Sequence, residues 1–130
     1  MIRGIDRVLL DVGDQDKTKA FWIDKLGFEL AYDQTYGEER WVEVRPPNGS
    51  PVLVLIPRAA NQEKPDVGDG MPHTNVFFTC DDMQRTYEEL RALGVRFPTP
   101  PTQMHFGWWS IFEDDEGTRH ALNVTARDQA

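Results

Sequence analysis

The chain has 130 residues, with 14 lysines and arginines against 22 aspartates and glutamates, and a net charge of −8. This acidity excludes nucleic acid and anionic membrane surfaces as expected partners, because both are negatively charged themselves. The single cysteine, Cys80, excludes an intrachain disulfide and a cluster of thiolate metal ligands within one chain. No apolar run approaches the roughly 20 residues that span a bilayer, and the first residues turn acidic too early for a signal peptide. A cytoplasmic protein of one domain, residues 1–130, is expected.

The first half of the chain, Arg7 to Leu55, predicts a strand, a helix and three further strands. Asp14 follows the first β-rich run and suits a helix N-cap, because its carboxylate can accept from backbone N–H groups of the first turn. Gly27 suits the left-handed residue that ends a helix. The run "PPNG" predicts a hairpin turn between the last two strands. The apolar stripe of the helix, with Trp22 as a core residue, is formed by Phe21, Trp22 and Leu26.

The segment from Arg58 to Pro72 lacks hydrophobic periodicity and contains proline and glycine, so it is predicted to be a linker. It divides the chain into a first module of about residues 3–58, a linker of about residues 59–72 and a second module of about residues 73–126.

The second half repeats the first at a constant spacing. Val8 precedes Val76, Asp14 precedes Asp82, Trp41 precedes Trp109 and Gly49 precedes Gly117, each by 68 positions. Asp82 is the predicted N-cap, Gly94 the predicted helix end and "DDEG" the predicted hairpin turn, in which Asp114, Asp115 and Glu116 are expected to face solvent. The predicted buried stripe of this helix consists of Met83, Thr86, Tyr87, Leu90 and Leu93.

This internal repeat predicts an α+β fold of two tandem βαβββ modules. Neither module can bury both faces of its sheet alone. The helices are therefore expected to cover the outer faces while two curled sheets enclose a cleft, which is where small-molecule sites are commonly found.

The runs "KAFWIDKLGFEL", "FFTCDDMQRTYEELRALGV" and "FEDDEGTRHALNV" resemble signatures of the vicinal oxygen chelate (VOC) superfamily, which includes glyoxalases, bleomycin-resistance proteins and extradiol dioxygenases. The resemblance extends from about Ile5 to Val124, although Asp115 replaces the usual proline of the last turn. It implies a glyoxalase/bleomycin-resistance-like fold and a homodimer. It does not choose among the family's lyases, isomerases, dioxygenases and binding proteins.

The resemblance also implies where the metal-dependent members carry their four ligands. These positions correspond to Arg7, to Leu53 or Val54, to Asn75 and to Ala121. A permanent cation and apolar side chains do not bind a divalent metal, so no cofactor is expected. The alternative is a relocated metal site built from His73, Glu43 and His105. His120 is expected to face away from the cleft, because it adjoins Ala121 in a strand.

Alternation along the strands extends the predicted cleft beyond these positions. Trp41 and Trp109 could provide ligand platforms or only pack the core, and Arg7 could bind an anion or pair with Glu43. The segment Thr102 to Trp109 could form a lid or a packed loop. The residues expected to line the cleft are Arg7, Trp41, Glu43, His73, Asn75, Phe77, Trp109, Ile111 and Ala121.

Three functional hypotheses remain. The first is a metal-free protein that binds a small, partly aromatic molecule in the cleft. The second is a metal-dependent lyase, isomerase or dioxygenase with the relocated site. The third is a non-catalytic structural or interaction module whose cleft is closed. The residues leave open whether any reaction is catalysed.

Overall fold

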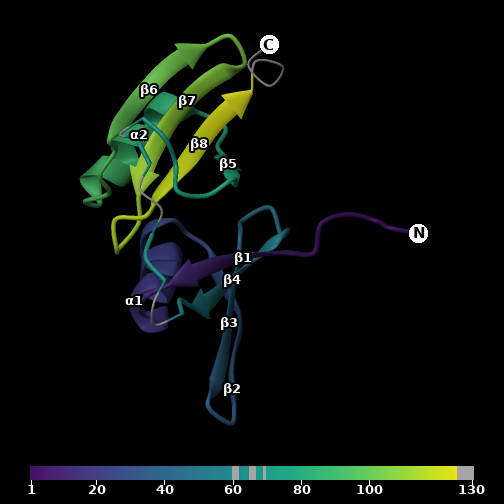
Figure 1. The fold of residues 1–130 in the computed structure, drawn as a ribbon. Coiled ribbons are helices and arrows are strands. Elements are labelled where there is room, and N and C mark those ends of the chain that lie inside the picture. Colours follow the sequence, from purple (N-terminus) through teal and green to yellow (C-terminus); the bar gives the residue numbers. More distant parts are fainter. Residues whose placement is uncertain (60–61, 65–66, 69, 126–130) are drawn as a thin grey trace. The chain divides into compact units, whose positions relative to one another are not determined.

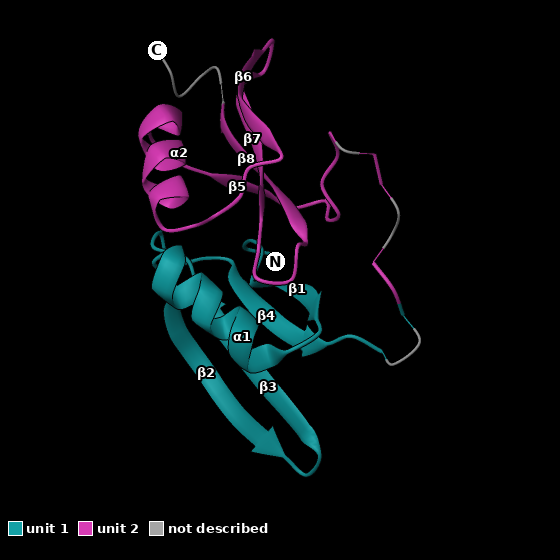
Figure 2. Cartoon of the chain, turned by 90° about the vertical axis from the view of Figure 1, so that its left-hand side faces the viewer, with its two compact units in different colours: residues 1–62 teal, residues 63–130 magenta. Residues whose placement is uncertain are grey.

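The computed structural model describes residues 1–59, 62–64, 67–68 and 70–125. Residues 60–61, 65–66 and 69 of the predicted linker, and residue 126 of the predicted second module, lie outside the described residues. The chain divides into two compact units, residues 1–62 and 63–130, each described here by itself (Figure 2). This boundary lies inside the predicted linker. Among the described residues no helix is long and apolar enough to cross a membrane.

Unit 1 contains a four-stranded sheet with one helical segment on one face (Figure 1). Its sheet order is β1-β4-β3-β2, with β1 parallel to β4 and the other pairs antiparallel. The elements in chain order are β1 (Arg7–Val12), α1 (Gln15–Ala20), the π-helix η1 (Phe21–Lys25), β2 (Glu29–Tyr36), β3 (Glu39–Arg45) and β4 (Val52–Pro57).

Unit 2 repeats this topology with the sheet order β5-β8-β7-β6 and one parallel pair, β5 with β8. Two four-stranded sheets, each with one helical segment, confirm the predicted α+β fold of two βαβββ modules. The elements are β5 (Phe77–Thr79), α2 (Met83–Ala92), β6 (Thr99–Met104), β7 (Gly107–Glu113) and β8 (Arg119–Thr125).

The predicted helix ends are confirmed in both units. The carboxylate of Asp14 accepts from the backbone N–H of Lys17, and that of Asp82 accepts from Arg85. Gly27 and Gly94 have φ angles of +75° and +91°, which a residue with a Cβ rarely adopts.

The helical segments of the two units differ in length by one residue. The sequence alignment of the halves needs one residue more in the first helix, and the structure places this residue in η1, where the wider π-helical turns accommodate it. The predicted buried stripe of the second helix is confirmed at Met83, whereas Thr86, Tyr87 and Leu90 are only half-buried. It is wrong at Leu93, which is exposed because α2 has already ended there.

The core of each unit lies between its helix and its sheet. In unit 1, Trp22 is fully buried and its ring lies 5.1 Å from that of Phe28. Gln15 holds α1 on the sheet by donating to the carbonyls of Arg40 and Leu55. In unit 2, Ser110 of β7 contacts Met83 of α2, which identifies the covered face of the second sheet. The opposite face of each sheet is called here its helix-free face.

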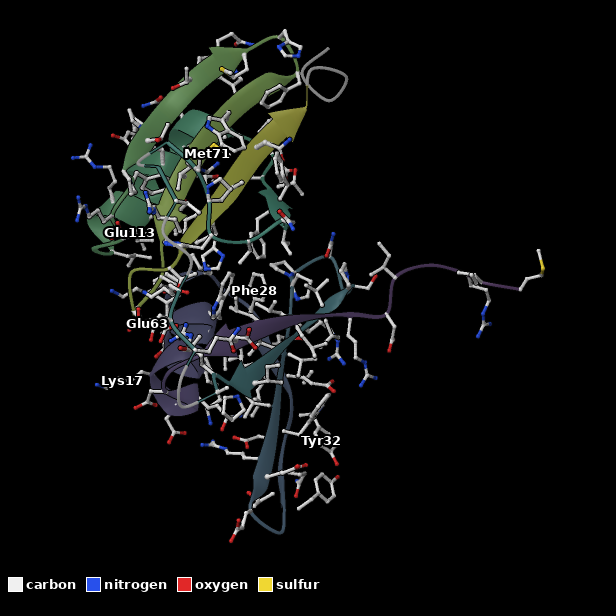
Figure 3. The ribbon with its side chains drawn as sticks, viewed as in Figure 1. Lys17, Phe28, Tyr32, Glu63, Met71 and Glu113 are labelled. Carbon is white, nitrogen blue, oxygen red and sulfur yellow. The ribbon has the colours of Figure 1, made fainter. Side chains whose placement is uncertain are left out.

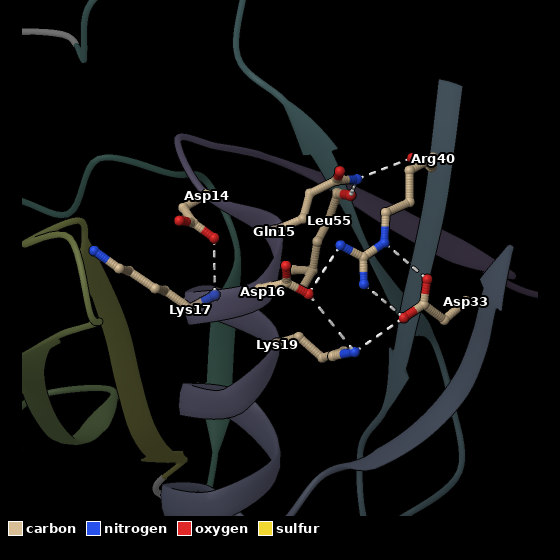
Figure 4. Close-up of polar contacts among 8 residues, drawn as sticks. All are labelled: Asp14, Gln15, Asp16, Lys17, Lys19, Asp33, Arg40 and Leu55. Carbon is tan, nitrogen blue, oxygen red and sulfur yellow. Dashed lines mark hydrogen bonds and ion pairs between the residues drawn. The ribbon is translucent and has the colours of Figure 1, made fainter. Parts of the chain in front are cut away.

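A charge network connects α1 with β2 and β3 (Figure 4). Arg40 contacts both carboxylate oxygens of Asp33 at 2.9 and 2.8 Å and Asp16 at 2.9 Å, while Lys19 contacts Asp33 at 2.9 Å. The Arg40 guanidinium, followed by the Lys19 ammonium, holds the pKa of Asp33 well below its usual range.

Replacing Asp33 with asparagine is expected to lower the free energy of unfolding by about 1–2 kcal/mol at pH 7, since charge-assisted hydrogen bonds are lost at a partly buried site. Because the pKa of Asp33 is lower in the folded than in the unfolded chain, its contribution is present above the unfolded pKa of about 4 and is lost as the pH falls further. Urea unfolding of wild type and Asp33→Asn at pH 7 and at pH 3 measures this difference in the free energy of unfolding. A stability difference between wild type and Asp33→Asn that does not shrink at pH 3 would contradict it.

Candidate functional site

Strand register decides which residues share the helix-free face of the first sheet. Leu9 pairs with Val54, Val54 with Glu43, and Glu43 with Tyr32, so these four side chains form one row across the sheet. Leu53 pairs with Val44 on the helix side and belongs to the core. Of the two candidates for the second implied ligand position, the register therefore selects Val54.

A polar cluster of Arg7, Trp41 and Glu43 occupies this face. The indole Nε1 of Trp41 donates to the Glu43 carboxylate at 2.6 Å, and the Arg7 guanidinium lies 3.7 Å from the same oxygen atom. Arg7 also contacts Asp6 at 2.8 Å. The predicted ion pair of Arg7 with Glu43 exists, and both residues belong to the first sheet. Asp6 provides a second carboxylate, which the sequence pattern does not predict because it pairs Arg7 with Glu43 alone.

Tyr32 is a residue of this face that sequence reasoning missed. It extends from the β2–β3 hairpin (Figure 3) and lies opposite Glu43 in the register. Its hydroxyl makes a hydrogen bond with that of Tyr36, and this bond raises the pKa of Tyr32, so the phenol stays neutral at pH 7. The alternation in "AYDQTY" predicts that Tyr32 and Tyr36 share a face. Only the pairing of β2 with β3 shows that this is the face of Glu43.

On the second sheet, the register joins three predicted residues. Phe77 pairs with Ala121, and Ala121 pairs with Ile111. They lie opposite Ser110 and Leu122, which face α2. The prediction that Phe77, Ile111 and Ala121 share one face is therefore correct. Ile111 and Ala121 are buried, whereas Phe77 is 53% exposed, so Phe77 is the accessible member of this row.

An aromatic cluster, formed by Phe77, Phe106 and Trp109, lies on this helix-free face. The ring centroids of Phe77 and Trp109 are 5.3 Å apart, and those of Phe106 and Trp109 are 6.0 Å apart at nearly perpendicular planes. The sequence predicts that Phe106 lies in the loop or lid of Thr102–Trp109. That assignment is wrong, because this segment forms two paired strands joined by a turn at residues 105–106.

His73 is held by the edge of β8. Its Nδ1 accepts from the backbone N–H of Arg119 at 2.8 Å, and the backbone N–H of His73 donates to the Arg119 carbonyl. Burial, followed by the charge of Arg119, lowers the pKa of His73, so the ring is neutral at pH 7. His73 and Asn75 precede β5, which begins at Phe77, so the strand alternation that places His73 in the predicted cleft, on the face of Asn75, is wrong.

The residues at the four implied metal positions do not fit a divalent cation: they are a guanidinium, two apolar side chains and an exposed amide, contributed by Arg7, Val54, Ala121 and Asn75. No group of three or more histidines, cysteines, aspartates and glutamates in the described part of the chain could hold a metal ion. The absence of a cofactor stays a prediction.

Two of the proposed relocated ligands lie far apart within unit 2. His73 contacts Arg119, which pairs with Glu113 at one end of β7, whereas His105 precedes Gly107 at the other end. Six residue steps at about 3.3 Å each separate these ends by roughly 20 Å. One ion cannot be ligated by both imidazoles.

The turn before β8 contains a buried polar pair that sequence reasoning missed. His120 Nε2 and Asp114 Oδ2 are 2.9 Å apart, and both side chains are only 1% exposed. Asp115 is exposed as expected, but the expectation that Asp114 faces solvent is wrong. The prediction that His120 faces away from Ala121 is correct, since its partner Phe112 lies on the helix side.

The helix side of unit 2 carries a cavity of about 480 Å³. Trp108 contributes to it, so the adjacent residues Trp108 and Trp109 serve opposite faces of the sheet. Cys80 follows β5 and is half-buried, and burial raises the pKa of its thiol, which keeps it protonated at pH 7. The cavity is lined by Asp81, Asp82, Met83, Gln84, Pro101, Trp108 and Val124.

Two βαβββ units, each with a helix-free sheet face carrying aromatic side chains, define the class of protein. The model of the Glyoxalase/Bleomycin resistance protein/Dioxygenase superfamily matches residues 4–122, and the chain belongs to this superfamily.

Similar proteins cover nearly the whole chain. The uncharacterized protein YetH of Bacillus subtilis (strain 168) is 36% identical over 118 residues, which are 90% of this chain and 94% of YetH. The crystal structure of UcmS2 is 32% identical with a TM-score of 0.74 and covers 95% of this chain and 98% of its own. TnmS3, an antibiotic binding protein from Streptomyces sp. CB03234, is 25% identical with a TM-score of 0.79. The match covers 96% of this chain and 98% of TnmS3.

Proposed function

We propose that this protein binds a small organic molecule through a flat aromatic ring, without a metal ion, on the helix-free face of the second sheet. The observation that carries the proposal is the aromatic cluster, in which Phe77 is exposed next to Trp109. A predicted cleft between the units would add the face of the first sheet to this site, and that enclosure stays a prediction.

The physical argument is that an exposed phenylalanine next to a tryptophan offers apolar surface whose burial is favourable. Burying apolar area contributes roughly 25 cal/mol per Å². A ring packed against Phe77 and Trp109 gains about 0.5–1.5 kcal/mol per aromatic pair in addition. Small-molecule sites combine such surfaces with a few polar groups that fix orientation.

Two further findings support the proposal. TnmS3, which is similar over nearly the whole chain, is an antibiotic binding protein. The residues at the implied metal positions include the cation of Arg7 and the apolar Val54 and Ala121, and these favour binding over metal-dependent catalysis.

The test is calorimetric titration with 2-naphthol as a flat aromatic probe. We expect Trp109→Ala to weaken binding at least tenfold, because the central ring of the cluster is removed. Trp108→Ala is the matched control, since Trp108 lies on the opposite face and should leave binding unchanged. Equal affinity of Trp109→Ala and wild type would overturn the proposal. It would favour a module whose aromatic cluster only packs.

The competing hypothesis of a metal-dependent lyase, isomerase or dioxygenase is tested separately. Protein treated with a chelator is titrated with zinc, nickel, manganese and ferrous ions. Tight stoichiometric uptake that is lost in His73→Ala would contradict the metal-free part of the proposal.

We further propose that the protein works as a homodimer in the cytoplasm. The resemblance implies the dimer, and exposed apolar side chains such as Leu9 provide surface for it. Sedimentation equilibrium of the full chain measures the mass, and a monomer at micromolar concentration would contradict the dimer.

A further inference from the structure

Asn123 lies on the helix-free face of the second sheet, next to the aromatic cluster. It pairs with Thr79 on β5 and with Trp109 on β7. Its neighbours Leu122 and Val124 alternate to the other side, where Leu122 lies opposite Ser110 and Val124 lines the cavity beside α2. The amide of Asn123 is therefore directed to the same side as the rings of Trp109 and Phe77.

Asn123 is largely buried as a residue, and its side-chain amide has no hydrogen-bond partner among the described residues. Only 8% of the residue is exposed, and its backbone carbonyl accepts from the N–H of Cys80. Its side-chain amide makes no hydrogen bond within residues 1–59, 62–64, 67–68 and 70–125, and its polar atoms are not among the fully enclosed ones that lack a partner, so they are open to a ligand. Polar groups of largely buried residues are usually hydrogen-bonded to protein, water or a ligand, so this amide is available to a bound molecule.

The surroundings restrict what could satisfy this amide. The ring next to it, Trp109, contacts Phe77 and Phe106. A molecule whose ring packs on this cluster brings its edge to the amide, which has both donor N–H groups and an acceptor oxygen. A hydroxyl or carbonyl oxygen at that edge would complete the hydrogen bonding of Asn123.

We propose that Asn123 is a specificity-determining residue and that it selects planar aromatic molecules carrying a hydroxyl or carbonyl oxygen on the ring, such as phenols and quinones. This inference rests on the proposed function and names the ligand class of the same site. A site that hydrogen-bonds a ligand oxygen disfavours the analogue lacking it, because the bound analogue would cover the amide and leave it without a partner.

The experiment compares two probes of similar shape, 2-naphthol and 2-methylnaphthalene, by calorimetric titration. Wild type is expected to bind 2-naphthol roughly tenfold more tightly, the magnitude of one neutral hydrogen bond. Asn123→Leu keeps the size of the side chain but removes the amide. It should bind both probes with equal affinity. Its melting temperature should not fall, because no hydrogen bond with described residues is removed.

The outcomes separate the two proposals. If wild type and Asn123→Leu bind both probes alike while Trp109→Ala weakens both, the inference about Asn123 is overturned and the aromatic site stands. If Trp109→Ala binds both probes as tightly as wild type, or wild type binds neither, the proposed function is overturned together with this inference.

Discussion

Replacing Trp22 with alanine is expected to lower the free energy of unfolding of unit 1 by about 3–5 kcal/mol, the usual loss for a large buried aromatic residue. Trp22 is fully buried and its ring contacts those of Phe21 and Phe28. Its carbonyl accepts from the N–H of Phe28, so the residue also connects η1 with the segment leading to β2.

Urea unfolding followed by circular dichroism measures this loss. Trp108→Ala provides a control of the same residue type, because Trp108 is 37% exposed and should cost only about 1 kcal/mol. Similar losses for the two variants would show that Trp22 does not form the core of unit 1.

The second large effect is expected at the buried pair of Asp114 and His120. Asp114→Ala should lower the free energy of unfolding by about 3–5 kcal/mol, because His120 would lose its partner in the interior. The other carboxylate oxygen accepts from the backbone N–H groups of Glu116 and Thr118 at 3.0 Å each, so the turn before β8 would also lose two hydrogen bonds.

Asp115→Ala is the control for this prediction, since Asp115 is the next residue in the same turn and is exposed. It should change the stability by no more than about 0.5 kcal/mol. Asp114→Asn should lie between the two, because an amide oxygen can still accept from the turn. An Asp114→Ala variant as stable as Asp115→Ala would contradict a structural role for the pair.

The proposed aromatic binding site and the proposed role of Asn123 depend on adjacent residues of one sheet face. Trp109 provides the aromatic surface, and Asn123 on the neighbouring strand provides the hydrogen-bonding group. Trp109 could be predicted from the sequence because it repeats Trp41 at the constant spacing. Asn123 could not, because nothing in "HALNV" indicates that its amide lies beside an aromatic ring.

Local patterns in the sequence determined the architecture of this protein. The caps at Asp14 and Asp82, the glycines after each helix and the repeated spacing act over a few residues or through direct repetition, so they can be read without knowing which strands pair. The family resemblance rests on the runs "KAFWIDKLGFEL", "FFTCDDMQRTYEELRALGV" and "FEDDEGTRHALNV", and the matched superfamily model confirms it.

Only the tertiary structure decided which side chains meet. The register placed Val54 rather than Leu53 on the helix-free face, gave His73 its partner in Arg119, and buried Asp114 against His120. These contacts join residues on different strands and turns, and a shift of one residue in the pairing would direct every side chain of a strand to the other face. Polar residues such as Asp114 and Asn123 therefore carry no sign of burial in the sequence, because their burial depends on neighbours that the pairing of strands brings to them.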